Sequence, residues 1–351
     1  MDDGVIRSIL DGMGSRERAA DPGSLCFCET GYRPVKFSEQ NFHSFHAGRE
    51  VGTAVTFIDG GNAEIFSSPD ACVHFVRIFH TTYRDNLRIS CSADEFYVFA
   101  KAARSGDSVV FSARLFKSKT ACLTDSFFAE DFTFNPLDSR LLERSSRLSI
   151  SKVPGIVRRL AELSTALILV GKAEKGSVVV IDGDLNARLS DETKLINALG
   201  SVARSRQAVV CGLSKTSSLL TSDGISVFSV LESGAPDAPW YYYPAAVSSS
   251  ADVGVSFVKL HPKSGYIFKL ESFHFDDGSK VMFPLLAANS TDPVFLGYPY
   301  GMIEADRFAR VSNREAEYLR TVFMAKAGKS WELIESAAKA LDAHSVLDRI
   351  S

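Results

Sequence analysis

Several signatures that would narrow the function of this 351-residue chain are missing from it. Its six cysteines form no CxxC pair, so a cysteine-ligated zinc knuckle is not expected, and its first residues lack the apolar core of a secretion signal. No apolar run approaches the roughly 18 residues that a membrane-spanning helix needs. We therefore expect a cytoplasmic protein with free thiols that does not insert into a membrane.

A glycine loop for binding phosphate is also missing. The stretch AGKS at 327–330 is not a P-loop, because the position five residues before Gly328, where a glycine is required, is Phe323. No GxGxxG sequence follows an expected strand. The net charge of −3 provides no basic field that would gather nucleic acid passively. A nucleic-acid enzyme is still compatible with this charge, because a site that holds metal ions must itself be acidic.

The composition is that of a globular protein, with 45% apolar and 23% charged residues. The length suits one large α/β domain with insertions or two modest domains. We interpret residues 1–50 as an extension that contains a short amphipathic helix and the aromatic stretch FHSFH at 42–46. Phenylalanine is frequent, at 25 residues, which hints at an aromatic partner surface in addition to the core.

Strand and helix patterns alternate in the rest of the chain. Runs of β-branched and aromatic residues predict a β-meander from Val51 onward. A helix is expected at about 154–170, followed by a strand at SVVVIDG, a helix opened by LSDETKL and a strand at QAVVCGLSK. Later strands are expected at DVGVSFVKLH, GYIFKLES and DPVFLGYPYG, and helices near 303–325 and 330–342. This alternation predicts parallel strands buried on both faces of an α/β sheet.

Two apolar runs each end in the triplet Ile-Asp-Gly. AVTFIDGG places Asp59 after one expected strand, and VVVIDGDL places Asp182 after another. A single Asp-Gly is usually a turn, because Asp tolerates left-handed backbone and Gly adopts positive φ. Two such carboxylates, each at the C-terminal end of an expected central strand, have a second interpretation. If they are brought close together, their mutual repulsion favours a hard cation such as Mg²⁺ or Mn²⁺ between them. We expect the glycines after Asp59 to turn the backbone away and leave its carboxylate open.

A third carboxylate is available on the helix expected before the second Asp-bearing strand. Glu162 lies on this helix, four residues after Arg158. It is either a further metal ligand or an exposed i,i+4 partner of that arginine, which would contribute only a few tenths of a kcal/mol. The residues alone leave both interpretations open.

The stretch LGYPYGMIEADRFARVSNREAEYL at 296–319 carries more candidates. We expect a strand that ends at Tyr298, an interruption at Pro299, and then a helix with Glu304 and Asp306 in its first turns. Acidic residues at this place also complement the helix dipole, so their presence does not by itself indicate a site.

Basic residues occur near the same elements. Arg307, Arg310 and Arg314 follow one another at spacings of three and four, which predicts a basic stripe on one face of a single helix. Such a stripe is usually solvated, but beside a carboxylate cluster it suits a phosphate backbone. Lys215 follows the strand in CGLSK, where its ammonium group either meets a phosphate or lies on the surface after a turn.

In their order and spacing, these elements resemble the NurA family of DNA-repair nucleases, archaeal and bacterial enzymes that work beside the hexameric ATPase HerA. The resemblance spans about residues 50 to 320, and it depends on the whole set, because each motif is weak alone. The motifs are FIDGG at 57–61, Glu162, IDGDL at 181–185, GLSKTS at 212–217, VKLHP at 258–262 and GYPYGMIEADRFARVS at 297–312.

The resemblance implies an RNase H-like α/β fold, in which a mixed sheet is flanked by helices. The expected parts are an N-terminal extension at 1–50, a nuclease domain with a β-rich insertion at 51–325, and a C-terminal helical segment at 326–351 packed on the same domain. The resemblance further implies Asp59 on the first strand, Asp182 on the fourth strand and Glu162 on a helix.

It also implies an activity, which is metal-dependent hydrolysis of DNA by a 5′-to-3′ exonuclease and single-strand endonuclease that resects ends in double-strand-break repair. Two Mn²⁺ or Mg²⁺ ions are expected, and Tyr298 would orient the water or a phosphate oxygen. The implied metal ligands are Asp59, Glu162, Asp182 and Asp306. The implied DNA contacts are Lys215, Arg307, Arg310 and Arg314. Many relatives carry His where this chain has Asp306, so a fourth carboxylate here raises the negative charge of the expected site.

Partners follow from the same resemblance. We expect a homodimer and a HerA-type ATPase that delivers the DNA, with the N-terminal helix and FHSFH as candidate contacts. Two alternatives stay open. One is an RNase H-like scaffold that docks on the ATPase after losing catalysis, and the other is a nuclease of the same fold that acts on RNA.

Overall fold

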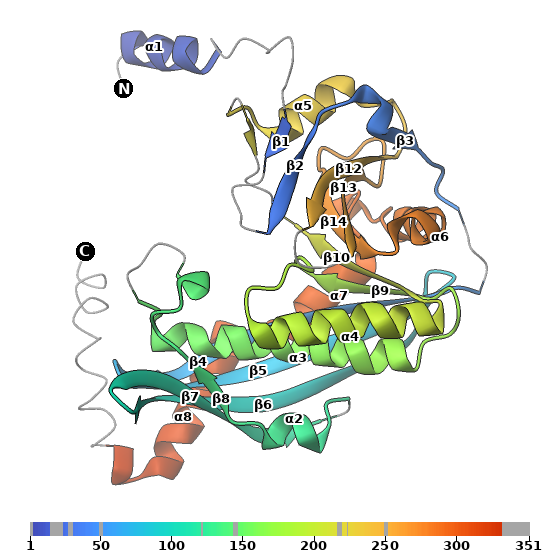
Figure 1. Ribbon diagram of the computed structural model, residues 1–351. Helices are drawn as coiled ribbons and strands as arrows, with labels where there is room; N and C mark the ends of the chain where they lie inside the picture. The colour runs from blue at the N-terminus through green and yellow to red at the C-terminus, as the bar shows by residue number, and fades with distance from the viewer. Residues whose placement is uncertain are drawn as a thin grey trace.

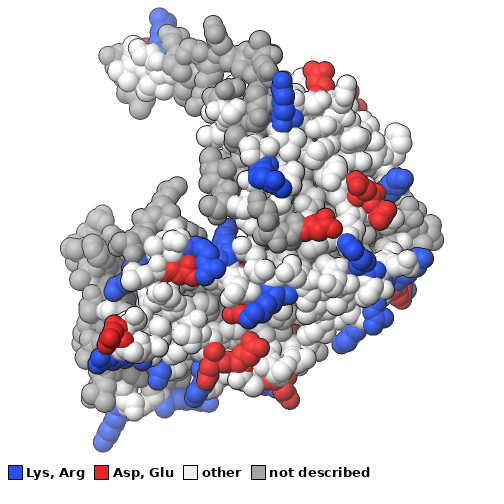
Figure 2. Space-filling view, viewed as in Figure 1, with Lys and Arg blue, Asp and Glu red and all other residues white. Residues whose placement is uncertain are grey.

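The computed structural model describes residues 3–14, 24–26, 31–48, 52–120, 122–142, 147–215, 220–222, 224–248 and 252–331. These residues build one large mixed β-sheet with helices packed on both of its faces (Figure 1). On the face drawn in Figure 2, acidic and basic side chains are interspersed, and the described residues form no continuous basic patch there. Within the described part of the chain, no helix has the length and apolar character that crossing a membrane requires.

Five strands form the centre of the sheet, in the order β6-β5-β4-β9-β10. Strand β5 is antiparallel to its neighbours β4 and β6, whereas β4, β9 and β10 run parallel to one another. In chain order these strands are the first to the fifth, and their spatial order is 3-2-1-4-5, the arrangement of an RNase H-like fold. The fold expected from the sequence is therefore confirmed. The bounds of the strands are Ala54–Ser67 (β4), Ala71–Arg84 (β5), Leu87–Ser105 (β6), Val178–Asp182 (β9) and Val209–Ser214 (β10).

Additional strands extend both edges of this centre. Beyond β6 lie Ser108–Lys119 (β7) and Phe132–Phe134 (β8), which complete the expected meander. Beyond β10 lie Phe268–Phe273 (β14), Val253–Lys259 (β13) and Trp240–Ser248 (β12), all antiparallel. Short strands complete that edge: Ser24–Cys26 (β1), Tyr32–Lys36 (β2), Phe42–Ser44 (β3) and Leu220–Thr221 (β11). Part of the segment interpreted as an N-terminal extension thus pairs with β12 in the main sheet.

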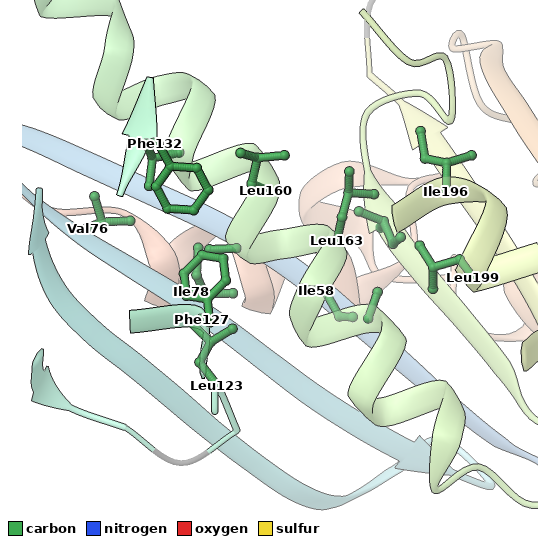
Figure 3. Close-up of a cluster of buried hydrophobic side chains, with 14 of the residues drawn as sticks. Ile58, Val76, Ile78, Leu123, Phe127, Phe132, Leu160, Leu163, Ile196 and Leu199 are labelled. Atoms are coloured by element: carbon green, nitrogen blue, oxygen red, sulfur yellow. The ribbon is translucent and has the colours of Figure 1, made fainter. Parts of the chain in front are cut away.

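Helices cover the sheet on two sides. On one face, α3 places Leu160 and Leu163 over β4 and β5, and α4, which packs beside α3 and on β10, carries Ile196 and Leu199 (Figure 3). On the other face, α7 packs against β4 and β5, and α6 packs against β14. The α-helices are Asp3–Gly14 (α1), Asp125–Ala129 (α2), Val153–Gly171 (α3), Ser190–Arg206 (α4), Val227–Gly234 (α5), Phe275–Ala288 (α6), Tyr300–Ala309 (α7) and Asn313–Ala327 (α8). The 3₁₀ helices are Glu39–Asn41 (η1), Ser139–Leu141 (η2), Ile150–Lys152 (η3) and Pro293–Phe295 (η4).

The central elements form where the sequence patterns predict them. The run Val178–Ile181 in β9 is fully apolar because helices cover both faces of this strand, and its side chains are at most 2% exposed. Helix α3 begins with Pro154 in its first turn, where the missing amide hydrogen costs no helical bond. Its apolar stripe packs on β4, which places this helix directly above the first strand.

The prediction for DPVFLGYPYG was wrong. This stretch forms no strand but the short helix η4 followed by a turn, because Pro293 starts η4 and Gly297 has a φ of +90°. Helix α7 then begins at Tyr300, directly after Pro299. Tyr298 therefore lies in the connection between η4 and α7 instead of at a strand end.

The helix expected near 303–325 is interrupted. Helix α7 ends at Ala309, Arg310 has an extended backbone with ψ of 127°, and α8 begins at Asn313 with Ser312 as its N-cap. The helix expected near 330–342 lies almost entirely outside the described residues, as does most of the expected segment 326–351.

Two aromatic residues expected to face a partner contact rings of their own chain. Phe42 packs edge-on against Trp240, and Phe45 stacks on Phe283. Helix α1 differs, because Val5 and Leu10 on this helix are 49% and 58% exposed. The aromatic stretch at 42–46 therefore contributes to the packing of the sheet edge, whereas α1 carries exposed apolar side chains.

Candidate active site

The two Asp-bearing strands run side by side. Strands β4 and β9 are parallel neighbours with Ile58 opposite Ile181, so Asp59 and Asp182 follow at adjacent positions on the same face of the sheet. Asp59 is buried at 5% exposure, whereas the Asp182 side chain is 27% exposed. The convergence predicted from the two Ile-Asp-Gly triplets is present.

Lys215 lies at the centre of this group. Its Nζ is 3.3 Å from Asp182 Oδ2, 3.7 Å from Asp59 Oδ2 and 2.6 Å from Asp306 Oδ1. The lysine follows β10, and Asp306 reaches the group from α7. Four elements thus bring three carboxylates and one ammonium group together, and we call these four residues the Lys215 cluster.

Glu162 approaches β4 from the opposite face of the sheet. Successive residues of a strand point to opposite faces, so Gly60 faces α3 when Asp59 faces α7. A Cβ on Gly60 would lie 2.4 Å from Glu162 Oε1, which shows that this carboxylate fills the space beside the glycine. Glu162 is only 4% exposed, so its interpretation as an exposed helix residue is wrong, although its ion pair with Arg158 is present at 3.4 Å.

The glycines after Asp59 have a different role from the predicted one. Strand β4 continues through both of them to Ser67, and neither has a positive φ, so the backbone does not turn there. A Cβ on Gly61 would lie 2.2 Å from the carbonyl oxygen of Ala309. Gly60 therefore admits Glu162 on one face, and Gly61 admits the end of α7 on the other. Only Gly183, after Asp182, has the predicted turn geometry, with a φ of +95°.

Two arginines that the sequence interpretation left out of the site connect α3 to both Asp-bearing strands. Arg158 donates to the Gly60 carbonyl at 2.7 Å. Arg159 donates to the carbonyls of Asp182 and Asp184 and lies 3.6 Å from Glu162 Oε2. Their spacing of four and three residues before Glu162 could have indicated this role, because side chains one helical turn apart lie on the same face and reach the same strands.

Tyr298 lies beside the Lys215 cluster, and its hydroxyl group is buried without a hydrogen-bond partner in the described part of the chain. Its side chain is 1% exposed, and its hydroxyl makes no hydrogen bond to any residue that the structure describes. Burial, followed by the charges of Asp182, Asp59 and Asp306, raises the pKa of Tyr298 well above its usual range. The hydroxyl is therefore neutral and available to a further group.

Electrostatic repulsion within the site is strong. Burial raises the pKa of Asp59 to about 8, with Asp182 and Glu162 adding to the effect and Lys215 opposing it. Burial also raises the pKa of Glu162, although Arg158 and Arg159 lower it. The site thus favours any added positive charge that would allow its carboxylates to ionise together.

The expected basic stripe is absent as a single helical face. Arg307 lies on α7, Arg310 in the extended break after it and Arg314 on α8, although all three are exposed. The break occurs where the α7 end passes Gly61 of β4. A DNA contact for these arginines stays a prediction.

Glu304, noted from the sequence for its place near a helix start, is a buried anchor of α7. Its Oε2 accepts hydrogen bonds from Thr81 at 2.8 Å and Tyr83 at 2.7 Å, and its Oε1 pairs with Arg88 at 2.5 Å. These partners hold α7 on β5 and so fix the helix that carries Asp306. No local sequence pattern indicates this role, because the partners lie more than 200 residues away.

No protein-family model matches the chain, and no curated protein matches its sequence. Some solved structures are distantly similar to it. The catalytic domain of human endonuclease V has a TM-score of 0.34 at 13% identity, over 78% of this chain and 85% of that one. Argonaute from Aquifex aeolicus has a TM-score of 0.26 at 11% identity, over 74% of this chain and 28% of that one. Kluyveromyces polysporus Argonaute with a guide RNA has a TM-score of 0.30 at 9% identity, over 73% of this chain and 26% of that one.

These similarities are too low to carry an argument about activity. In the described residues, no group of three or more His, Cys, Asp or Glu side chains is arranged to hold a metal ion as they stand, and the Lys215 ammonium lies among the Asp carboxylates. The donor chemistry nevertheless fits a hard divalent cation, because all candidate ligands are carboxylate oxygens on adjacent elements. The unpaired Tyr298 hydroxyl beside them supplies a further oxygen.

Proposed function

We propose that this chain is a divalent-metal-dependent nuclease of the NurA type that hydrolyses phosphodiester bonds in DNA. The observation that carries the proposal is the Lys215 cluster, in which Asp59, Asp182 and Asp306 come within 4 Å of one cationic group from three separate elements. A structural ion pair would need one carboxylate. Three carboxylates around a single site suit a reaction that brings further positive charge and a phosphate.

The residues proposed to hold a metal ion are Asp59, Asp182, Asp306 and Glu162. A bound Mn²⁺ or Mg²⁺ would lower the pKa of a water molecule and stabilise negative charge on the phosphate oxygens. Glu162 is held by Arg158 and Arg159 on the α3 face of β4, so we propose that it fixes the strand ends as well as contributing an oxygen.

In the proposed reaction, the oxygen of a water molecule bonds to phosphorus while the bond from phosphorus to one ester oxygen breaks. The water loses a proton, and the leaving oxygen gains one. The Tyr298 hydroxyl would orient the water or a phosphate oxygen, because it is neutral and has a free donor. Lys215 would stabilise charge on the phosphate, and Arg307, Arg310 and Arg314 would contact the DNA backbone.

The proposal includes a biological setting taken from the NurA resemblance. The chain would act as a homodimer with a HerA-type ATPase, degrade DNA from the 5′ end, cut single strands internally, and thereby resect ends during double-strand-break repair. The interspersed charges in Figure 2 agree with a partner that delivers DNA. The exposed apolar side chains of α1, including Val5 and Leu10, are the proposed contact surface.

The test is cleavage of labelled single-stranded DNA by the full chain with Mn²⁺, beside Asp59→Ala and Asp182→Ala. Both variants should lose cleavage while retaining the wild-type melting temperature within a few degrees. Asp107→Ala is the matched control, because this fully exposed aspartate lies at the β6–β7 turn, and it should cleave normally. Full activity in either site variant would contradict the proposal. A 5′ label and a 3′ label distinguish the direction of degradation, and a matched RNA strand tests the alternative substrate.

A second candidate function is the catalytically inactive scaffold that binds an ATPase. The observation that favours it is the pairing of every candidate ligand with Lys215, Arg158 or Arg159. Calorimetric titration with Mn²⁺ separates the two functions. A scaffold would show no heat of binding that depends on Asp59, whereas a nuclease site would lose its binding in Asp59→Ala.

A further inference from the structure

Lys215 lies among carboxylates, whereas a surface lysine that only binds phosphate would point into solvent. Its side chain is 31% exposed, and it lies within ion-pairing distance of three carboxylates at once. The ammonium group stands where the three carboxylates would otherwise need another cation.

The charges of the Lys215 cluster decide how many additional cations it can hold. When a bound cation keeps all three ionised, Asp59, Asp182 and Asp306 supply three negative charges, and Lys215 supplies one positive charge. One divalent ion neutralises the two charges that remain, whereas two divalent ions would leave an excess of two positive charges in a partly buried site. Unbalanced charge in such a site is costly because water screens it poorly.

Glu162 adds no uncompensated negative charge to this balance. Its carboxylate lies on the α3 face of β4, beside Gly60, and it is already compensated by Arg158 at 3.4 Å and Arg159 at 3.6 Å. These two arginines also donate to backbone carbonyls of the Asp-bearing strands, so they are fixed in place by more than the one carboxylate. The negative charge of Glu162 is thus already compensated by arginines of the chain itself.

We propose that Lys215 is a built-in cation that takes the place of one of the two divalent ions expected for an RNase H-like nuclease, so that the site binds a single ion. This inference rests on the proposed function, because it concerns the same site. In this inference the main role of Lys215 is to compensate the negative charge of the carboxylates, and its contact with the phosphate is secondary. It also replaces the expected pair of ions by one ion and one ammonium group.

The variants that test this differ in charge but little in size. Lys215→Met keeps an unbranched side chain, removes the charge and vacates the place of the ammonium group. A second divalent ion there would leave an excess of one positive charge in this variant, instead of two in the wild type. Lys215→Arg keeps the charge. The double variant Lys215→Met with Asp306→Asn restores the net charge of the wild-type cluster, because one carboxylate is removed with the ammonium group.

The experiment counts Mn²⁺ ions on the full chain by calorimetric titration and examines the bound ions by electron paramagnetic resonance. Two Mn²⁺ ions about 3.5–4 Å apart, the separation in two-metal sites, couple magnetically, whereas a single ion does not. We expect one uncoupled ion on the wild type, Lys215→Arg and the double variant. We expect a second, coupled ion on Lys215→Met.

Two results would overturn the inference: two coupled ions on the wild type, or a single ion on folded Lys215→Met. If Lys215→Met does not fold, the count on the wild type decides. Cleavage of DNA measured in parallel separates this inference from the proposed function. Mn²⁺-dependent cleavage with two coupled ions refutes the role of Lys215 and leaves the nuclease standing, whereas the absence of both Mn²⁺ binding and cleavage refutes both.

Discussion

Asp59→Asn should stabilise the metal-free protein, and the gain should grow as the pH rises from about 4 to about 8. Burial and the repulsion of Asp182 and Glu162 raise the pKa of Asp59 from 3.8 to about 8. Below pH 3.8 the carboxyl group is protonated in both the folded and the unfolded chain, so it costs nothing. As the pH rises, the unfolded chain ionises this group first, and the folded state loses stability until the pH passes about 8.

The magnitude follows from the size of the pKa change. A change of about four pKa units corresponds to an upper limit of about 6 kcal/mol, at about 1.4 kcal/mol for each unit. Relaxation of nearby side chains and entry of water reduce this value, and we expect about 2 kcal/mol at pH 8. For a chain of this length, such a gain raises the melting temperature by about 3 °C. Asparagine keeps the size of aspartate and cannot ionise, so packing contributes little to the difference.

The assay is thermal denaturation of the wild type and Asp59→Asn at pH 5, 6, 7 and 8 in the presence of a chelator. Asp107→Asn serves as the control, because its side chain is fully exposed, and it should show no trend with pH. A difference between Asp59→Asn and the wild type that does not change with pH would refute the reasoning. Adding Mn²⁺ should reverse the order at pH 8, because only the wild type can bind the ion through this carboxylate.

Three further substitutions test the packing around the site. Gly61→Ala should lower the free energy of unfolding by about 1–3 kcal/mol, because its Cβ would lie 2.2 Å from the Ala309 carbonyl oxygen; an unchanged melting temperature would contradict this. Tyr298→Phe should raise stability by about 1 kcal/mol, because it removes a buried hydroxyl without a hydrogen bond, while DNA cleavage falls; equal cleavage would remove Tyr298 from the mechanism. Glu304→Gln should lower stability by about 1–2 kcal/mol in chemical denaturation, because the hydrogen bonds that Thr81 and Tyr83 donate to a carboxylate become bonds to a neutral amide; a loss below about 0.5 kcal/mol would show that Glu304 is not an anchor.

The central part of the fold could be predicted because its signals are local. The apolar run before Asp182 and the helix with Pro154 in its first turn each carry their own pattern, and both form as expected. The end of the chain was harder. The interruption between α7 and α8 depends on Gly61, which lies about 250 residues earlier and leaves room for the backbone of Ala309 and Arg310. No periodicity within 300–320 could report a contact with a strand so far away in the sequence.

The candidate site divides in the same way. Asp59 and Asp182 were predictable as neighbours, because two parallel strands with the same triplet bring the same positions together. The partners of these carboxylates were not predictable, since Lys215 and Arg159 each have an equally good interpretation as solvated surface residues. Only the three-dimensional arrangement shows that three carboxylates share Lys215 and that Arg159 donates a hydrogen bond to the Asp182 carbonyl.

The two glycines after Asp59 show why the site has this form. A turn at Gly60 would have left Asp59 at the rim of the sheet, where solvent screens its charge and one neighbouring carboxylate costs little. Because β4 continues instead, Asp59 lies in the middle of a covered strand, with Glu162 entering beside Gly60 and α7 beside Gly61. Close approach on both faces is what buries the carboxylate and raises its pKa to about 8. A side chain at Gly60 would push Glu162 away from β4, and a side chain at Gly61 would push away the end of α7, the helix that carries Asp306. These two glycines therefore allow the close packing that makes the site need a cation.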